Sequence, residues 1–154
     1  MENQLRKLVH IGFAVKDMEK TIENMRTVYG LEPDRMTQMD GAQQGRKFRG
    51  KDANFVIRIV FYRFANIELE FISPISGDSS YSEFLEKHGD GMQHLCFDVA
   101  DLDGAKEDLH NNGFELIQEG VTTRNVPGLC FAYFDAADSL GHVIEVVNFA
   151  KFDK

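Results

Sequence analysis

The sequence predicts an α+β protein built from two tandem modules, each with the order strand–helix–strand–strand–strand. The first observation is an internal repeat: LVHIGFAVKDMEKTIE aligns with MQHLCFDVADLDGAKE, which places His10 on His94 and Asp17 on Asp101. The second is the period-two alternation of apolar residues before each aspartate, which indicates a strand with two different faces. The third is the helical spacing of apolar residues after each aspartate, a favourable N-cap residue. A repeat at a fixed offset indicates one supersecondary unit used twice.

The repeat fixes the expected order of elements along the chain. We place the first module at residues 1–75, a connector with a short helix at 76–90, and the second module at 91–154. Each module helix is expected to end at a glycine, Gly30 in the first and Gly113 in the second. Pro74 is expected to stop the last strand of the first module. The strands are expected at residues 8–15, 31–37, 54–63, 67–73, 93–99, 114–121, 130–135 and 143–148, and the connector helix near 81–88.

Composition narrows the function classes. The chain has 154 residues, of which 43% are hydrophobic, and a net charge of −8. That acidic balance argues against a nucleic-acid-binding protein, whose affinity rests on a positive surface. No apolar run approaches the roughly 18 residues of a membrane span, and the N-terminus lacks the apolar core of a signal peptide. Cys96 and Cys130 lie inside expected strands, and we interpret both as reduced core thiols of a cytoplasmic protein.

Two glutamates occupy equivalent apolar strands at the ends of the two modules. Glu70 lies within LEFI and Glu145 within IEVV, and the two segments align in the repeat. A carboxylate embedded in an apolar strand is costly unless it is paired or binds a metal. Together with the strand-borne His10 and His94, they suggest one shared site for a divalent cation: Co, Ni, Mn, Zn or Fe(II).

The other histidines fit this site poorly. His88 and His110 lie in the connector and on a helix, and His142 is an odd number of residues from Glu145, so a regular strand sends it to the other face. Taken singly, His10 and His94 are better explained as structural residues or as polar positions on a strand, and Glu70 could be an exposed edge-strand residue. The equivalent positions in the repeat favour metal ligation for all four.

Residues 40–51 are expected to form a polar loop with a cationic cluster. Two interpretations of this cluster remain open. It could bind an acidic group, such as a nucleotide phosphate or a carboxylate, or it could be part of a solvated loop. The cluster consists of Arg46, Lys47, Arg49 and Lys51.

From Leu8 to Val147 the chain resembles the vicinal oxygen chelate superfamily (glyoxalase, bleomycin-resistance and dioxygenase proteins). That resemblance implies a glyoxalase-like fold, in which paired βαβββ modules form a cupped mixed sheet around a metal, with His10, Glu70, His94 and Glu145 as ligands. The connector phrase FLEKHGDG, residues 84–91, is most similar to methylmalonyl-CoA epimerases.

The resemblance also implies a reaction. A small-molecule substrate, an acyl-CoA or another compound with chelating oxygens, would lose and regain a proton next to a carbonyl through an enolate. Glu145 is the first candidate for a ligand that doubles as acid and base, with Glu70 or Asp40 as its partner. These epimerases usually carry a further acid/base glutamate after the second strand. This chain has no glutamate there, and Asp40 is the only acidic residue between positions 35 and 51.

Three alternatives accompany this hypothesis. A glyoxalase-I-type isomerase uses the same enolate chemistry on a hemithioacetal. An Fe(II) dioxygenase of the superfamily uses two histidines and one carboxylate, so ligation by Glu70 counts against it. A metal-free binding protein would show melting and ligand binding that are indifferent to EDTA. The superfamily also implies a homodimer.

Overall fold

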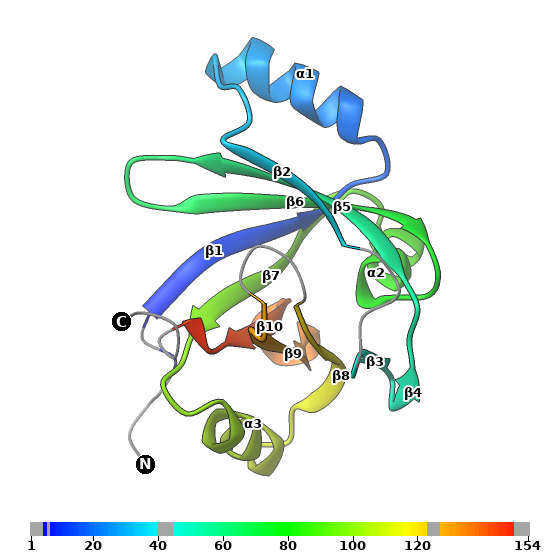
Figure 1. The fold of residues 1–154 in the computed structure, drawn as a ribbon, viewed down its shortest axis with the longest axis vertical. Helices are drawn as coiled ribbons and strands as arrows, with labels where there is room; N and C mark the ends of the chain where they lie inside the picture. The colour runs from blue at the N-terminus through cyan, green and yellow to red at the C-terminus, as the bar shows by residue number, and fades with distance from the viewer. Residues whose placement is uncertain (1–4, 6, 40–44, 123–126, 150–154) are drawn as a thin grey trace.

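The computed structural model describes residues 5, 7–39, 45–122 and 127–149, which form one mixed sheet curled into a cup (Figure 1). The strand order is β2-β5-β6-β1-β7-β10-β9-β8-β3-β4. The strands are β1 (Lys7–Ala14), β2 (Arg35–Met39), β3 (Lys47–Phe48), β4 (Lys51–Asp52), β5 (Val56–Arg63), β6 (Glu68–Ser76), β7 (Gly91–Asp98), β8 (Glu115–Val121), β9 (Cys130–Ala136) and β10 (His142–Val147). The helices are α1 (Met18–Tyr29), α2 (Ser80–His88), α3 (Leu102–Asn111) and the four-residue α4 (Ala137–Leu140).

The two halves of the sheet repeat one topology. In the first half β1 is followed outward by β6, β5 and β2, and in the second half β7 is followed by β10, β9 and β8. The first strand of each half pairs in parallel with the last, whereas β1 and β7 meet antiparallel at the centre. The expected tandem βαβββ fold and cupped mixed sheet are therefore confirmed. The module limits at residues 75 and 91 stay a prediction.

Each half carries one helix on its convex side. Figure 1 shows α1 and α3 on the outer surface, at opposite ends of the molecule. The side chains of Asp17 and Asp101 accept hydrogen bonds from the backbone amides of Lys20 and Gly104, both at 3.0 Å, so each is the N-cap that the repeat predicted. Gly30 ends α1 with a left-handed φ of 67°.

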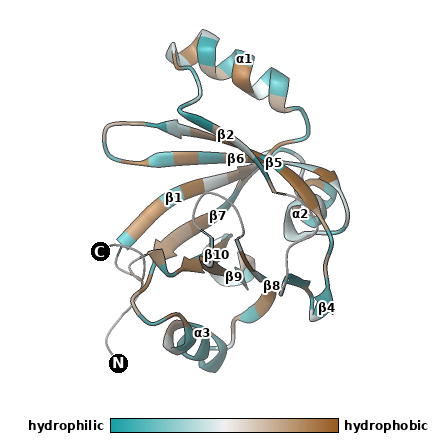
Figure 2. Cartoon of the chain, in the orientation of Figure 1, coloured by the Kyte–Doolittle hydropathy of each residue, from teal (hydrophilic) through white to brown (hydrophobic). Residues whose placement is uncertain are grey.

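Apolar side chains gather in three clusters that follow the strand alternation. One lies between α1 and the first half, another between α3 and the second half, and the third fills the concave side of the cup. Figure 2 shows hydrophobic residues concentrated on the strands and mixed polarity along the helices. On β1, Phe13 packs toward α1, whereas Ala14 belongs to the concave cluster. The concave face is thus where side chains from both halves meet.

The connector helix α2 begins with a capping box, in which Ser79 and Ser82 exchange hydrogen bonds between side chain and backbone. Its buried face carries Tyr81 and Leu85 into the concave cluster. Among the described helices, none has the length and apolar character needed to cross a membrane.

Two strand boundaries in the first half differ from the prediction by at least three residues. The second strand begins at Arg35 rather than Leu31, because Leu31 closes α1 by donating its amide to the carbonyl of Met25. β6 runs through Pro74, which was expected to stop it. The pairing of β6 with β1 ends at Ile72. Pro74 therefore has no neighbouring strand on that side, and the N–H that proline lacks is not needed for a hydrogen bond there.

The predicted polar loop at residues 40–51 is partly wrong. It contains β3 and β4, and β3 pairs with β8 and so extends the far edge of the second half. The cationic cluster is also dispersed. Arg46 is buried, with its guanidinium 4.3 Å from the ring centre of Phe55, and Arg49 pairs with Glu83 on α2 at 2.6 Å. The four cationic residues therefore form neither a joint binding site for an acidic group nor a wholly solvated loop.

The two cysteines differ in burial. Both are free thiols, as expected. Cys96 is fully buried in the concave cluster, whereas Cys130 is the first residue of β9 and only half-buried, so the prediction of a core thiol is wrong for Cys130.

Candidate metal centre

The two predicted histidines meet at the seam between the halves. His10 on β1 and His94 on β7 are both buried, and their Nε2 atoms lie 3.2 Å apart. The ladder explains this proximity: His94 is the register partner of Gly12, and His10 is the register partner of Cys96. A Cβ at position 12 would lie 1.9 Å from Cε1 of His94, so the imidazole of His94 occupies space that only a glycine leaves open.

The two predicted glutamates complete the cluster, one from each half. Glu145 contacts Nε2 of His10 and Nε2 of His94 through the same oxygen, Oε2, at 3.2 Å each. Glu70 uses both oxygens, Oε2 toward His10 at 3.5 Å and Oε1 toward His94 at 3.6 Å. Both carboxylates are buried. All four predicted ligands therefore converge within one chain. Among the described residues, the groups that could hold a metal ion are His10, Glu70 and His94, and His10, Cys96 and Glu145, so Cys96 also lies within reach; His88, His110 and His142 belong to neither group.

Electrostatics distinguishes the two carboxyl groups. Burial raises the pKa of Glu70, and the neighbouring charge of Glu145 adds to the rise. Burial also opposes ionisation of Glu145, but hydrogen bonds from His10 and His94 outweigh it and hold its pKa well below the usual range. Burial lowers the pKa of His10, yet the charges of Glu70 and Glu145 more than compensate and raise it to about 9. The two buried carboxyl groups therefore favour a positive charge, either a proton on a histidine or a cation, at the centre of the four side chains.

The donor set fits a divalent cation. In a metal-bound state, Nδ1 of His94 would donate to Oε1 of Gln93, 2.9 Å away, and Nε2 would present its lone pair to the ion in place of its hydrogen bond to Glu145. Lone pairs that converge in this way repel one another unless a cation lies between them. Metal–ligand distances of about 2.0–2.2 Å place adjacent ligand atoms roughly 3.0–3.5 Å apart, and the contacts above span 3.2–3.6 Å.

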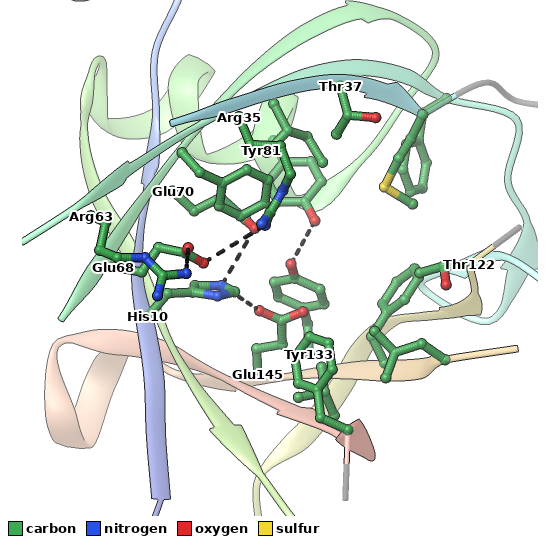
Figure 3. A pocket seen from close by; sticks show the side chains of 18 residues that line it. His10, Arg35, Thr37, Arg63, Glu68, Glu70, Tyr81, Thr122, Tyr133 and Glu145 are labelled. Atoms are coloured by element: carbon green, nitrogen blue, oxygen red, sulfur yellow. Dashed lines mark hydrogen bonds and ion pairs between the residues drawn. The ribbon is translucent and has the colours of Figure 1, made fainter. Parts of the chain in front are cut away.

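The cluster lies on one wall of a cavity of about 440 Å³ on the concave side (Figure 3). His10, Glu70 and Glu145 line this cavity, whereas His94 is fully buried behind them. The remaining lining is largely apolar and aromatic, which is typical of a small-molecule site. The cavity residues are His10, Arg35, Thr37, Met39, Phe55, Ile59, Phe61, Arg63, Glu68, Glu70, Tyr81, Thr122, Leu129, Phe131, Tyr133, Glu145, Val147 and Phe149.

Two arginines of the cavity lie on the β2–β5 side of His10. The guanidinium of Arg35 stacks 3.8 Å from the ring centre of Phe61, and Glu68 lies 3.8 Å from Arg35 and 3.7 Å from Arg63. Both arginines are partly exposed, so they give the cavity a cationic side. Residues 40–51 supply no described side chain to this cavity.

Two tyrosines from other elements lie beside the four candidate ligands. Tyr81 on α2 and Tyr133 on β9 point toward each other beside Glu145 (Figure 3), and their hydroxyl groups share a hydrogen bond of 2.7 Å. Burial, reinforced by the charge of Glu145, raises the pKa of both phenols well above 10, so both keep their protons.

Sequence reasoning missed several of these residues. Tyr81 lies in the connector, outside the repeat, and the counterpart of Tyr133 beside Glu70 is Phe61, which has no hydroxyl. Gly12 does have a repeat counterpart: it aligns with Cys96, and each lies two residues after a candidate ligand histidine. The candidate acid/base residue Asp40 lies outside the described residues.

Known proteins resemble this chain over most of its length. The family model described as Glyoxalase/Bleomycin resistance protein/Dioxygenase superfamily matches residues 9–134. The ethylmalonyl-CoA/methylmalonyl-CoA epimerase of Cereibacter sphaeroides is 25% identical over 141 residues, which cover 91% of this chain and 96% of that protein. The human mitochondrial methylmalonyl-CoA epimerase is 25% identical over 118 residues, which cover 76% of this chain and 60% of that protein.

Solved structures show the same fold. A hypothetical protein of Bacillus halodurans superposes with a TM-score of 0.68 at 20% identity, covering 92% of this chain and 93% of that one. A Streptomyces coelicolor methylmalonyl-CoA epimerase variant in complex with 2-nitronate-propionyl-CoA gives 0.65 at 23% identity, covering 94% of both chains.

Proposed function

The chain belongs to the Glyoxalase/Bleomycin resistance protein/Dioxygenase superfamily, and from that premise we propose that it is a metal-dependent epimerase of a methylmalonyl-CoA-type thioester. The observation that carries the proposal is the convergence of two histidines and two glutamates in the wall of a 440 Å³ cavity. Relatives named as methylmalonyl-CoA epimerases support the substrate class. No relative reported above is named as a glyoxalase I or a dioxygenase, so neither alternative is favoured.

We propose that His10, Glu70, His94 and Glu145 hold one divalent ion of Co, Ni, Mn, Zn or Fe. Such an ion supplies Lewis-acid polarisation of two substrate oxygens when it is bound. The protein's own residues fix its place: Gln93 orients His94, and Glu70 spans both histidines with its two oxygens. The apolar lining keeps water from the α-carbon, and Arg35 and Arg63 attract the negative charge of the substrate.

We assign proton transfer to the two glutamates. Glu145 contacts the histidines through Oε2 alone and lines the cavity, so Oε1 is the oxygen that we propose removes the α-proton. Glu70 approaches from the other half of the cup, so we propose that it returns the proton on the opposite face of the α-carbon. Two carboxyl groups on opposite sides of an α-carbon are what inversion of configuration requires.

The decisive experiment follows the α-proton of (2R)- and (2S)-methylmalonyl-CoA by NMR in D2O, with and without added Co²⁺. We expect metal-dependent loss of the α-proton signal from both epimers. Glu145→Gln should abolish exchange from at least one epimer. Glu70→Gln should still exchange one epimer with solvent but not invert it, because only one base remains.

Glu119→Gln is the matched control, since Glu119 is a strand glutamate of the second half that pairs with Lys106 on α3 and does not line the cavity. It should exchange both epimers at the wild-type rate. Folded, Co²⁺-loaded wild-type protein that exchanges neither epimer would refute the substrate and direct the search to hemithioacetals.

We also propose a cytoplasmic homodimer. Large apolar side chains at Val28, Tyr29 and Met36 are more than half exposed, and a subunit interface would remove them from water. Sedimentation equilibrium of the wild-type protein should give twice the 17.5 kDa chain mass, and a monomer mass at all concentrations would refute the dimer. Subcellular fractionation tests the location.

A further inference from the structure

The hydrogen-bonded pair Tyr81–Tyr133 has no part in the function proposed so far. The two residues come from distant elements, α2 and β9, and their side chains are 3% and 2% exposed. Both nevertheless line the cavity, so what little surface they keep faces the substrate space (Figure 3). Aromatic neighbours fix their rings: Phe55 packs edge-on against Tyr81, and Phe131 edge-on against Tyr133.

The ladder places Tyr133 beside the proposed base. Tyr133 on β9 is the register partner of Glu145 on β10, and directly opposed residues of an antiparallel pair project from the same face of the sheet. The ring of Tyr133 also lies 5.1 Å, centre to centre, from the imidazole of His94. The hydroxyl pair is thereby held next to the cluster where we expect the reaction.

A count of protons shows what the pair offers. Two neutral phenols carry two protons, and the hydrogen bond between them uses one. Among the described residues, no third group shares a hydrogen bond with either hydroxyl. The second proton is therefore available to an acceptor in the cavity, and the first bond polarises the hydroxyl that donates it.

We propose that the Tyr81–Tyr133 dyad donates a hydrogen bond to the substrate oxygen on which negative charge develops as the α-proton leaves. This inference rests on the proposed epimerase function and adds two catalytic residues to it. Donors that are fixed in advance and surrounded by apolar side chains stabilise a developing oxyanion far better than water does. The competing explanation is structural: the bond merely ties α2 to β9.

The test compares Tyr133→Phe and Tyr81→Phe with wild type, all loaded with Co²⁺. The first readout is kcat and KM for methylmalonyl-CoA. The second is the affinity for 2-nitronate-propionyl-CoA, a charged mimic of the enolate, relative to the uncharged-acyl analogue propionyl-CoA. We expect kcat to fall about 10²-fold in at least one variant with little change in KM, and the preference for the nitronate to fall by a similar factor.

Tyr62→Phe is the control. Tyr62 is an equally buried tyrosine, but it packs under α1 and is absent from the cavity lining. Its kcat and nitronate preference should match wild type. Tyrosine variants that lose thermal stability but keep the wild-type nitronate preference would overturn the dyad alone. A wild-type protein that neither exchanges the α-proton nor prefers the nitronate would overturn the epimerase function together with the dyad.

Discussion

Gly12 and His94 are register partners on the central antiparallel strands, and the imidazole of His94 lies in the space above the Gly12 backbone. A Cβ at Gly12 would fall 1.9 Å from Cε1 and 2.1 Å from Nε2 of that ring. Because His94 is fully buried, its ring has no room to step aside. The candidate metal centre therefore depends on a glycine that is not one of its four proposed ligands.

Gly12→Ala should disrupt the centre. The added methyl must displace His94, so we expect Co²⁺ affinity to fall at least 100-fold and the free energy of unfolding of the metal-free protein to fall by about 1–3 kcal/mol, a typical cost of overpacking. Isothermal titration with Co²⁺ and chemical denaturation measure the two effects. Gly91→Ala is the control, since a Cβ there meets its nearest atom only at 4.0 Å. Unaltered Co²⁺ affinity in Gly12→Ala would contradict the geometry.

Gln93 orients His94 through the hydrogen bond to Nδ1. Gln93→Leu conserves the volume of this buried side chain but removes the acceptor, so the ring loses its tautomer preference. We expect Co²⁺ affinity to fall about 10–100-fold, the usual cost of losing such a partner. Gln93→Glu keeps an acceptor and should retain much more of the affinity than Gln93→Leu. Equal losses in the two variants would show that the hydrogen bond does not matter.

His10 should make the stability of the metal-free protein depend on pH. Its pKa rises from 6.5 to about 9 in the folded state, against the effect of burial, because Glu70 and Glu145 favour the charged ring. A raised pKa means that the stabilisation is complete below about pH 6.5 and is lost as the pH rises through 9, by up to about 3 kcal/mol.

Urea denaturation of EDTA-treated protein between pH 6 and 10 measures this loss. Saturation with Co²⁺ should abolish the slope, because the cation replaces the proton. His10→Gln removes the titrating ring and should flatten the profile of the metal-free protein. Stability that rises between pH 6.5 and 9 would contradict the assignment.

Cys96 and Cys130 should differ in reactivity. Burial raises the pKa of the Cys96 thiol well above 9, and the charges of Glu145 and Glu70 add to the rise. Because the thiolate is the reactive form, a thiol-specific chromogenic reagent at pH 8 should label native protein at Cys130 only. Denaturation should release the second equivalent, and Cys130→Ser should show no rapid labelling. Rapid modification of two thiols in the native protein would refute the burial of Cys96.

Local patterns predicted most of the fold. The caps at Asp17 and Asp101 and the alternation around His10 and His94 depend on near neighbours in sequence, which is why they were readable. Boundaries that depend on distant partners were missed. Pro74 remains within β6 because the pairing of β6 with β1 ends before it. β3 forms because it pairs with β8, which is distant in sequence.

By itself the sequence determined the repeat and the four residues that converge at its seam, because equivalent positions of a repeat become neighbours when two copies pair. The cupped shape of the sheet was implied by the resemblance to a known superfamily. Only the tertiary structure decided what surrounds them. The glycine beneath His94, the acceptor on Gln93 and the contact between Tyr81 and Tyr133 join residues that no repeat relates. Such contacts arise from how the connector helix and two strands pack around one cavity, and packing across a fold leaves no periodic trace in the chain.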